Sequence, residues 1–252
     1  MRTSNPALRE SIFRIHGYDG IQGKMSMQGT AIKTFFLLSL ASLTAGWIWY
    51  KFADVSIISH AKDIMTYLTL STIGAFILSI CTIFKPSWAP VTASLYALLE
   101  GVVLGSLSLI LDRQYPGIVL QALPLTFGTL VAMLVIYNSG LIKVNHKFRM
   151  IMFSAMSAIC LVYMLSWILS FFRINLPFIH SSGTIGVLFS LFVVGIAAFN
   201  LLLDFDFIEK GQAYGAPKYM EWYGAFSLMI SLVWLYVEIL RLLAKLRERD
   251  RR

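Results

Sequence analysis

Four carboxylate residues lie within or at the edge of stretches that otherwise have the composition of membrane-spanning helices: Glu100, Asp204, Asp206 and Glu238. A carboxylate that stands among Leu, Val and Phe generally lines a water-filled cavity, pairs with a partner, or carries a proton that leaves and returns. These four residues are therefore candidates for an ion or proton pathway.

The composition explains why these carboxylates stand out. Of 252 residues, 58% are hydrophobic and 13% are charged, and the mean hydropathy is +0.72. Because roughly 20 apolar residues cross a bilayer, we expect an all-α integral membrane protein with one compact domain of about seven helices. The basic residues behind the net charge of +8 lie in tails and loops. They indicate membrane orientation and contact with anionic lipid rather than nucleic-acid binding.

The chain is predicted to have three parts: a polar, flexible arm (1–30), a seven-helix transmembrane domain (31–244) and a basic tail (245–252). The distribution of Lys and Arg predicts a cytoplasmic N-terminus. An odd number of spans would then send the basic tail outward, against the same rule, so the side of the C-terminus stays open. The predicted spans are residues 31–52, 63–84, 89–111, 117–137, 149–172, 183–204 and 220–244.

Glu100 lies about halfway along the third predicted span, where its side chain does not reach water. Two interpretations remain open for it. Gly101 and Gly105 are four residues apart, a spacing that permits close helix contact, so Glu100 would be a protonated acid in a packing interface. Alternatively, its carboxylate faces a cavity in the ion pathway.

Asp204 and Asp206 stand at the end of the sixth predicted span. The helix dipole disfavours negative charge at a C-terminal end, and two acids so close together favour binding of a proton or a cation. The sequence therefore predicts a proton-sensitive mouth at this end. The alternative is a pair of charges in water at the membrane boundary.

Glu238 belongs to the last predicted span, and Arg241 follows three residues later on the same helical face. The spacing predicts an ion pair that fixes this helix, because removal of one partner would leave a lone buried charge. Ser231 lies on the same face, seven residues before Glu238. We find no metal-ligand spacing, phosphate-binding loop or recognisable oxyanion site in the sequence, so we predict no metal site, no cofactor and no enzyme.

Three segments of the chain resemble the Bax inhibitor family, and the polar arm resembles a divergent bacterial branch of it. Glu100-Gly101 with Gly105 is similar to the family's third helix, and Asp204 precedes Ile208 by four residues as in its sixth. The last span, from Ala225 to Leu243, is similar to its closing helix. The resemblance implies a bundle around a central last helix in the bacterial inner membrane, which acts as a pH-sensitive leak with calcium as the permeant ion.

In that family, as the resemblance implies, two acids on the last two helices share a proton and open the pore when they separate. Asp204 matches the first acid. The second falls on Ser231, so this sequence departs from the pattern at that position. Glu238, Asp206 and Glu221 are the alternatives for the missing acid.

Three functions remain open at this point. The first is a cation leak, in which Glu100 and Glu238 attract the ion and Asp204 with Asp206 senses protons. The second is a non-conducting regulator that binds membrane proteases or other membrane-protein partners in stress survival through its N-terminal arm. The third is a proton-coupled transporter, for which Pro90 and Pro124 would break helices.

Overall fold

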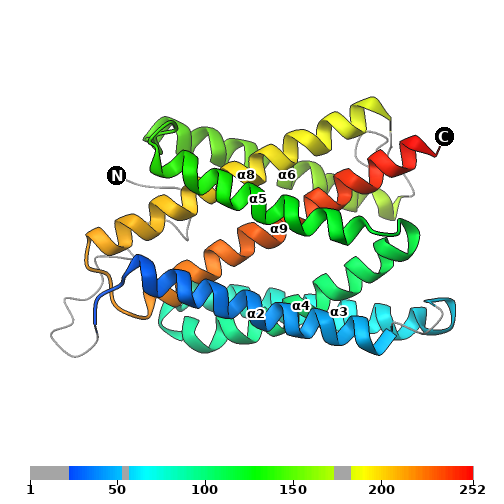
Figure 1. Ribbon diagram of the computed structural model, residues 1–252, viewed down its shortest axis with the longest axis horizontal. Helices are drawn as coiled ribbons and strands as arrows, with labels where there is room; N and C mark the ends of the chain where they lie inside the picture. Colours follow the sequence, from blue (N-terminus) through cyan, green and yellow to red (C-terminus); the bar gives the residue numbers. More distant parts are fainter. Residues whose placement is uncertain (1–22, 53–56, 173–182, 252) are drawn as a thin grey trace. The chain divides into compact units, whose positions relative to one another are not determined.

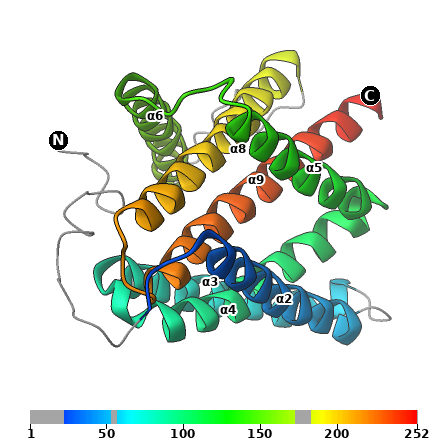
Figure 2. The same cartoon turned by 60° about the vertical axis from the view of Figure 1, so that its left-hand side comes forward.

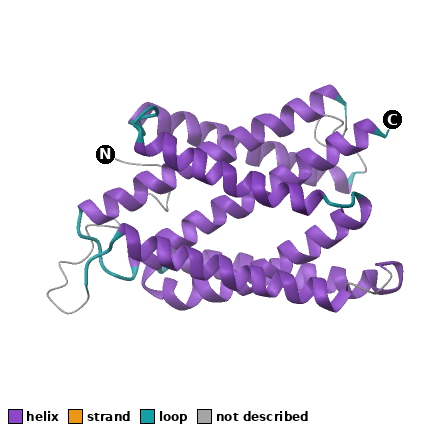
Figure 3. Cartoon of the chain, in the orientation of Figure 1, coloured by secondary structure: helices purple, strands orange, loops and turns teal. Residues whose placement is uncertain are grey.

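The computed structural model describes residues 23–52, 57–172 and 183–251, and these residues are almost entirely helical (Figures 1 and 3). Within these described ranges, seven helices are long and apolar enough to cross a membrane, which confirms the predicted fold class. A 3₁₀ turn, η2 (Pro86–Trp88), precedes the third of them. The seven helices are α2 (Met27–Phe52), α3 (Ile57–Phe84), α4 (Ala89–Gln114), α5 (Ile118–Asn138), α6 (His146–Phe171), α8 (Thr184–Ala213) and α9 (Met220–Asp250).

The ends of several helices follow from local residue types. Gly117 before α5 and Gly215 after α8 have φ of 79° and 66°, a backbone conformation that glycine adopts without strain. The side chain of Asn145 caps α6 by accepting the backbone N–H of Phe148 at 2.8 Å. Pro90 lies in the first turn of α4, and Pro124 lies inside α5, which continues to Asn138. Neither proline ends its helix, so the helix breaks considered for a transporter do not occur there.

Two helices extend past the ends of the predicted spans. The sixth span was expected to end at residue 204, but α8 continues to Ala213. Residues 245–252 were expected to form a tail, but α9 continues to Asp250. In both cases hydropathy falls while helix-forming residues continue, because a helix that leaves the apolar layer still forms its own backbone hydrogen bonds. The polar arm was expected to extend to residue 30, but α2 begins at Met27, and residues 1–22 lie outside the described part of the chain.

The chain divides into two compact units, whose boundaries fall within α4, α8 and α9. The first unit comprises residues 1–110 and 206–230. In it, α4 packs closely on α2, because a Cβ atom added at Gly105 would lie 2.8 Å from the Cα atom of Ala45. An apolar cluster of α2, α3 and α4 lies nearby. Its buried members are Ile48, Phe52, Ile64, Val102 and Leu109.

The second unit comprises residues 111–205 and 231–252, with α5, α6, most of α8 and the longer part of α9 (Figure 2). Aromatic pairs join α8 to its neighbours in this unit. Phe205 contacts Tyr137 of α5 at a centroid distance of 5.7 Å, and Phe199 contacts Phe148 of α6 at 6.3 Å. The second unit therefore positions α8 and α9 for the polar contacts described next.

Helix α9 is the most enclosed of the seven. Of its most apolar stretch, 56% is buried, compared with 44% for η2–α4 and 39% for α8. The other helices expose large apolar side chains, such as Phe35 of α2 and Leu120 of α5, at 73% and 77% exposure. Side chains of this kind suit contact with lipid.

Candidate functional site

Three polar side chains join α8 to α9 within the second unit. The side-chain amide of Asn200 donates a hydrogen bond to Ser231 Oγ at 2.7 Å, and the Ser231 hydroxyl donates to Oδ2 of Asp204. Asn200 and Asp204 are one turn apart on α8, so both reach the same position on α9. Asp204 and Ser231 are only 4% and 2% exposed. The structure thus brings together the two positions that the family resemblance pairs.

The chemistry of this contact differs from that of two acids. A hydroxyl group donates one hydrogen bond and accepts others, and Ser231 does both here. It can donate to an ionised Asp204 or accept from a protonated one. A change in the protonation of Asp204 therefore changes the charge at this place without creating repulsion between the two side chains.

Asp204 and Asp206 do not stand at a helix end, contrary to the prediction, because α8 continues for nine residues beyond Asp204. Their surroundings also differ. Asp206 belongs to the first unit and pairs with Lys210 one turn later, with an Nζ to Oδ1 distance of 2.8 Å. The expected proton-sensitive mouth of two adjacent acids is therefore wrong in its placement, and Asp206 has a cation of its own.

Glu238 forms the predicted ion pair with Arg241. The guanidinium nitrogen Nη1 lies 2.9 and 3.1 Å from the two carboxylate oxygens. Tyr163 of α6 adds a third member: its hydroxyl donates to Glu238 at 3.2 Å and accepts from Arg241 at 2.5 Å. The Glu238 side chain is 2% exposed and that of Arg241 is 38% exposed. The group fastens α9 to α6, and its tyrosine had not been predicted.

Lys245 is a functional candidate that we did not predict, because we assigned it to a tail. It lies on α9, is 6% exposed, and donates hydrogen bonds to two oxygens of α8. These are the carbonyl oxygen of Gly186 at 3.1 Å and the hydroxyl of Ser190 at 2.8 Å. The signal that could have found it is its spacing, since Lys245 is seven residues after Glu238 and so shares its face of the helix.

Glu100 lies in the first unit and forms a hydrogen bond with Tyr96, one turn earlier on α4. The neighbouring Gly101 lies against Ala41 and Thr44 of α2 so closely that a Cβ atom would overlap them. This arrangement fits the packing interpretation of the glycine pair. The part of Glu100 in an ion pathway stays a prediction.

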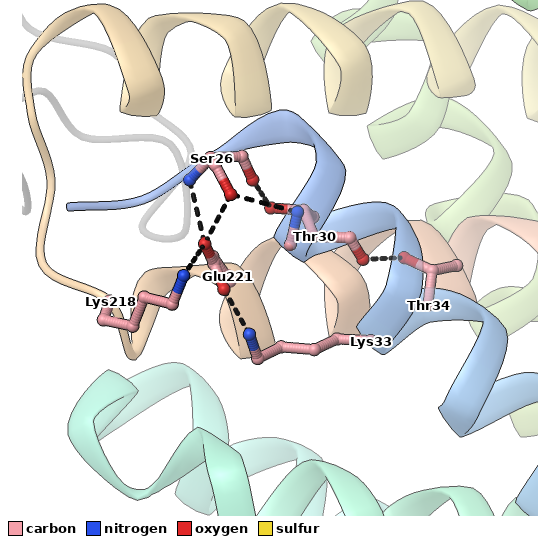
Figure 4. A network of polar contacts seen from close by, with 7 residues as sticks. Ser26, Thr30, Lys33, Thr34, Lys218 and Glu221 are labelled. Carbon is pink, nitrogen blue, oxygen red and sulfur yellow. Dashed lines mark hydrogen bonds and ion pairs between the residues drawn. The ribbon is translucent and has the colours of Figure 1, made fainter. Parts of the chain in front are cut away.

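Glu221, the last alternative for the missing acid, has its own partners in the first turn of α9 (Figure 4). It is 0% exposed. One carboxylate oxygen accepts the backbone N–H and the hydroxyl of Ser26 at 2.9 and 2.8 Å and pairs with Lys218 at 2.9 Å, and the other pairs with Lys33. Gly29 leaves the space that the carboxylate occupies. Glu221 therefore joins the segment before α2 to the start of α9.

Within the described residues, no group of three or more His, Cys, Asp or Glu side chains is arranged to hold a metal ion. What the site offers instead is a set of buried charges and hydroxyls along α9. Seven helices of spanning length with such buried polar contacts define an integral membrane protein of the all-α class.

Comparison with protein families identifies the family within this class. The family described as Bax inhibitor 1 like matches residues 5–248, which is nearly the whole chain. The protein belongs to this family. No curated protein and no solved structure matches it.

Proposed function

We propose that the protein is a pH-responsive cation leak, with calcium as a permeant ion and Asp204 as the group that binds the proton. The observation that carries the proposal is the buried hydrogen bond from Ser231 of α9 to Asp204 of α8. A carboxylate kept in this setting has a large effect on ions when it is ionised and little effect when it is protonated.

The direction of the pH dependence follows from charge. Ionised Asp204 attracts a cation, and its protonated form does not. Since Ser231 bonds to either form, the pair provides no repulsive force that would separate α8 from α9. We therefore expect cation flux to be larger at alkaline than at acidic pH, through the charge of Asp204 alone.

The test is calcium flux into liposomes that contain the purified protein and an indicator dye, measured at acidic and at alkaline pH. The Asp204→Asn variant keeps the size of the side chain and removes the titration, so its flux should lose the pH dependence. Asp63→Asn is the matched control, because Asp63 is exposed on α3. A folded Asp204→Asn protein with the wild-type pH profile would overturn the proposal.

A second candidate function is a non-conducting regulator that binds membrane-protein partners through its N-terminal arm. One observation favours it: the last residues of the arm, 24–26, contact the loop between α8 and α9 and the first turn of α9. Met25 donates its backbone N–H to the carbonyl oxygen of Ala216 at 2.7 Å, and Lys24 forms an isolated antiparallel β-bridge with Pro217. Ser26 donates its backbone N–H to Glu221. A partner bound to the arm would act directly on the start of α9.

Deletion of residues 1–23 tests this second function. The truncated protein should lose partners that the full chain captures by cross-linking in membranes, while its thermal unfolding stays cooperative. Recovery of the same partners by the truncated chain would show that the arm is not the binding segment.

A further inference from the structure

The buried polar face of α9 extends beyond the residues considered so far. Ser231, Glu238 and Lys245 follow one another at intervals of seven residues, so they drift by only about 20° per interval around the helix. They are 2%, 2% and 6% exposed. Each is bonded to another helix of the second unit: Ser231 and Lys245 to α8, and Glu238 to α6. One face of α9 thus carries polar groups over four turns.

Helix α8 contributes two matching sets of partners. Ser231 of α9 contacts Asn200 and Asp204 of α8. Fourteen residues later on α9, Lys245 contacts Gly186 and Ser190, which lie fourteen residues earlier on α8 than the first two. The two antiparallel helices therefore keep one register over about 21 Å. We call these contacts the Asp204 level and the Lys245 level.

The stretch of α8 between the two levels is apolar. Ala197 lies seven residues from both Ser190 and Asp204, and Val193 is one turn away from it; both are 0% exposed. Glu238, at the midpoint on α9, bonds to Tyr163 and Arg241 instead. A cation that followed this face would meet a carboxylate at the Asp204 level and an ammonium at the Lys245 level, with a buried apolar stretch of α8 between them.

The Lys245 level carries a positive charge that its hydrogen-bond partners do not neutralise. Its two acceptors in the described part of the chain, a carbonyl and a hydroxyl, are both neutral. Glu238, seven residues before Lys245 on α9, pairs with Arg241. These three charged side chains together have a formal charge of +1. A fixed charge of this kind acts strongly on ions because the surroundings screen it poorly.

We propose that Lys245 is an electrostatic barrier to cations and sets the selectivity of the leak. The inference rests on the proposed cation leak and deepens it: Asp204 attracts the cation, and Lys245 limits its passage. Charged side chains at a narrow point are a general means of ion selection. Because the electrostatic energy is proportional to the charge of the ion, the barrier is twice as high for a divalent as for a monovalent cation.

This proportionality makes the test specific. Lys245→Met keeps the length of the apolar stem and removes the charge. For a unit charge about 10 Å from the ion and an effective dielectric constant of about 20, potassium flux should rise roughly 16-fold and calcium flux roughly 270-fold. Lys245→Arg keeps the charge and should leave both fluxes within about twofold of the wild type.

The measurement is potassium and calcium flux through liposomes with the same number of protein molecules. Arg249→Met is the matched control, because Arg249 is exposed one turn later on α9 and its removal changes the total charge equally. Lys245→Gln is the second neutral variant, since its amide can still donate to Ser190. It should show the same change in the ratio of calcium flux to potassium flux. It replaces Lys245→Met in the test if that variant does not fold.

The outcomes separate the two proposals. A larger gain for calcium than for potassium in both neutral variants, absent from Arg249→Met, supports the barrier. Equal gains for the two ions indicate loosened packing and overturn the barrier, as do unchanged fluxes, while the leak itself stands. If wild type and all variants are folded and silent, the proposed leak is wrong and the barrier with it.

Discussion

Removal of the Glu221 carboxylate tests whether one buried acid holds the start of α9. Glu221 accepts the backbone N–H and the hydroxyl of Ser26 and pairs with Lys33 and Lys218 (Figure 4). The Glu221→Gln variant keeps the shape of the side chain and an oxygen for Ser26. It removes the negative charge and turns the amide group toward the ammonium group of Lys33, while the retained oxygen stays beside Lys218.

The magnitude follows from the exposure of each lysine. The Lys218 side chain is 51% exposed, so its pair with Glu221 contributes less than about 1 kcal/mol. The Lys33 side chain is 16% exposed, and loss of one partner from a buried pair typically costs about 3 to 5 kcal/mol. We expect Glu221→Gln to lower the free energy of unfolding by about 3 kcal/mol, or roughly 6 to 12 °C in Tm.

Thermal unfolding in lipid nanodiscs, followed by tryptophan fluorescence, measures this loss, and the centre of the Trp222 ring lies 5.5 Å from Lys33 Nζ. Two further variants provide an internal comparison: Lys33→Met should destabilise the protein more than Lys218→Met does. A Glu221→Gln protein whose Tm is within about 2 °C of the wild type, a shift of less than about 1 kcal/mol, would refute the reasoning. A larger effect of Lys218→Met than of Lys33→Met would refute the ranking by burial.

Two further predictions address the contact between α8 and α9 and the packing of α4. Ser231→Asp places a second acid beside Asp204, and two such carboxylates share a proton, so the pH profile of calcium flux should become steeper than in Ser231→Asn; equal profiles would count against it. Gly101→Ala forces a Cβ atom into the backbone of Ala41 and should destabilise the protein by about 1 to 3 kcal/mol in thermal unfolding. Gly46→Ala, which meets nothing within 4 Å, is the control and should be neutral or stabilising by up to about 1 kcal/mol; similar losses in both would contradict the packing argument.

Hydropathy and local spacing were sufficient for the parts of the structure that depend on neighbours in sequence. The seven helices follow from apolar runs of spanning length. The pair Glu238–Arg241 follows from its i, i+3 spacing. The close approach at Gly101 and Gly105 follows from the absence of side chains on one helix face.

The remaining contacts depend on which helices become neighbours, and a single sequence does not contain that information. Ser26 and Glu221 are 195 residues apart, and Tyr163 and Glu238 are 75 apart. Lys245 was missed for a related reason. The sequence around a charged residue that follows an apolar run is the same whether its side chain lies in water or donates to α8. The pairing of Asp204 with position 231 was accessible only through the family resemblance.

The two levels on α9 respond differently to movement of that helix. The Ser231 hydroxyl is attached directly to Cβ, so a shift of α9 by one residue, about 1.5 Å, exceeds the range over which a hydrogen bond to Asp204 persists. Lys245 has a stem of four carbons and can follow such a shift while it stays bonded to Ser190. The position of α9 therefore acts on the proton-binding contact, whereas the charge of Lys245 acts on the ion. Variants at 231 should consequently change the pH profile, and variants at 245 the ion ratio, independently of each other.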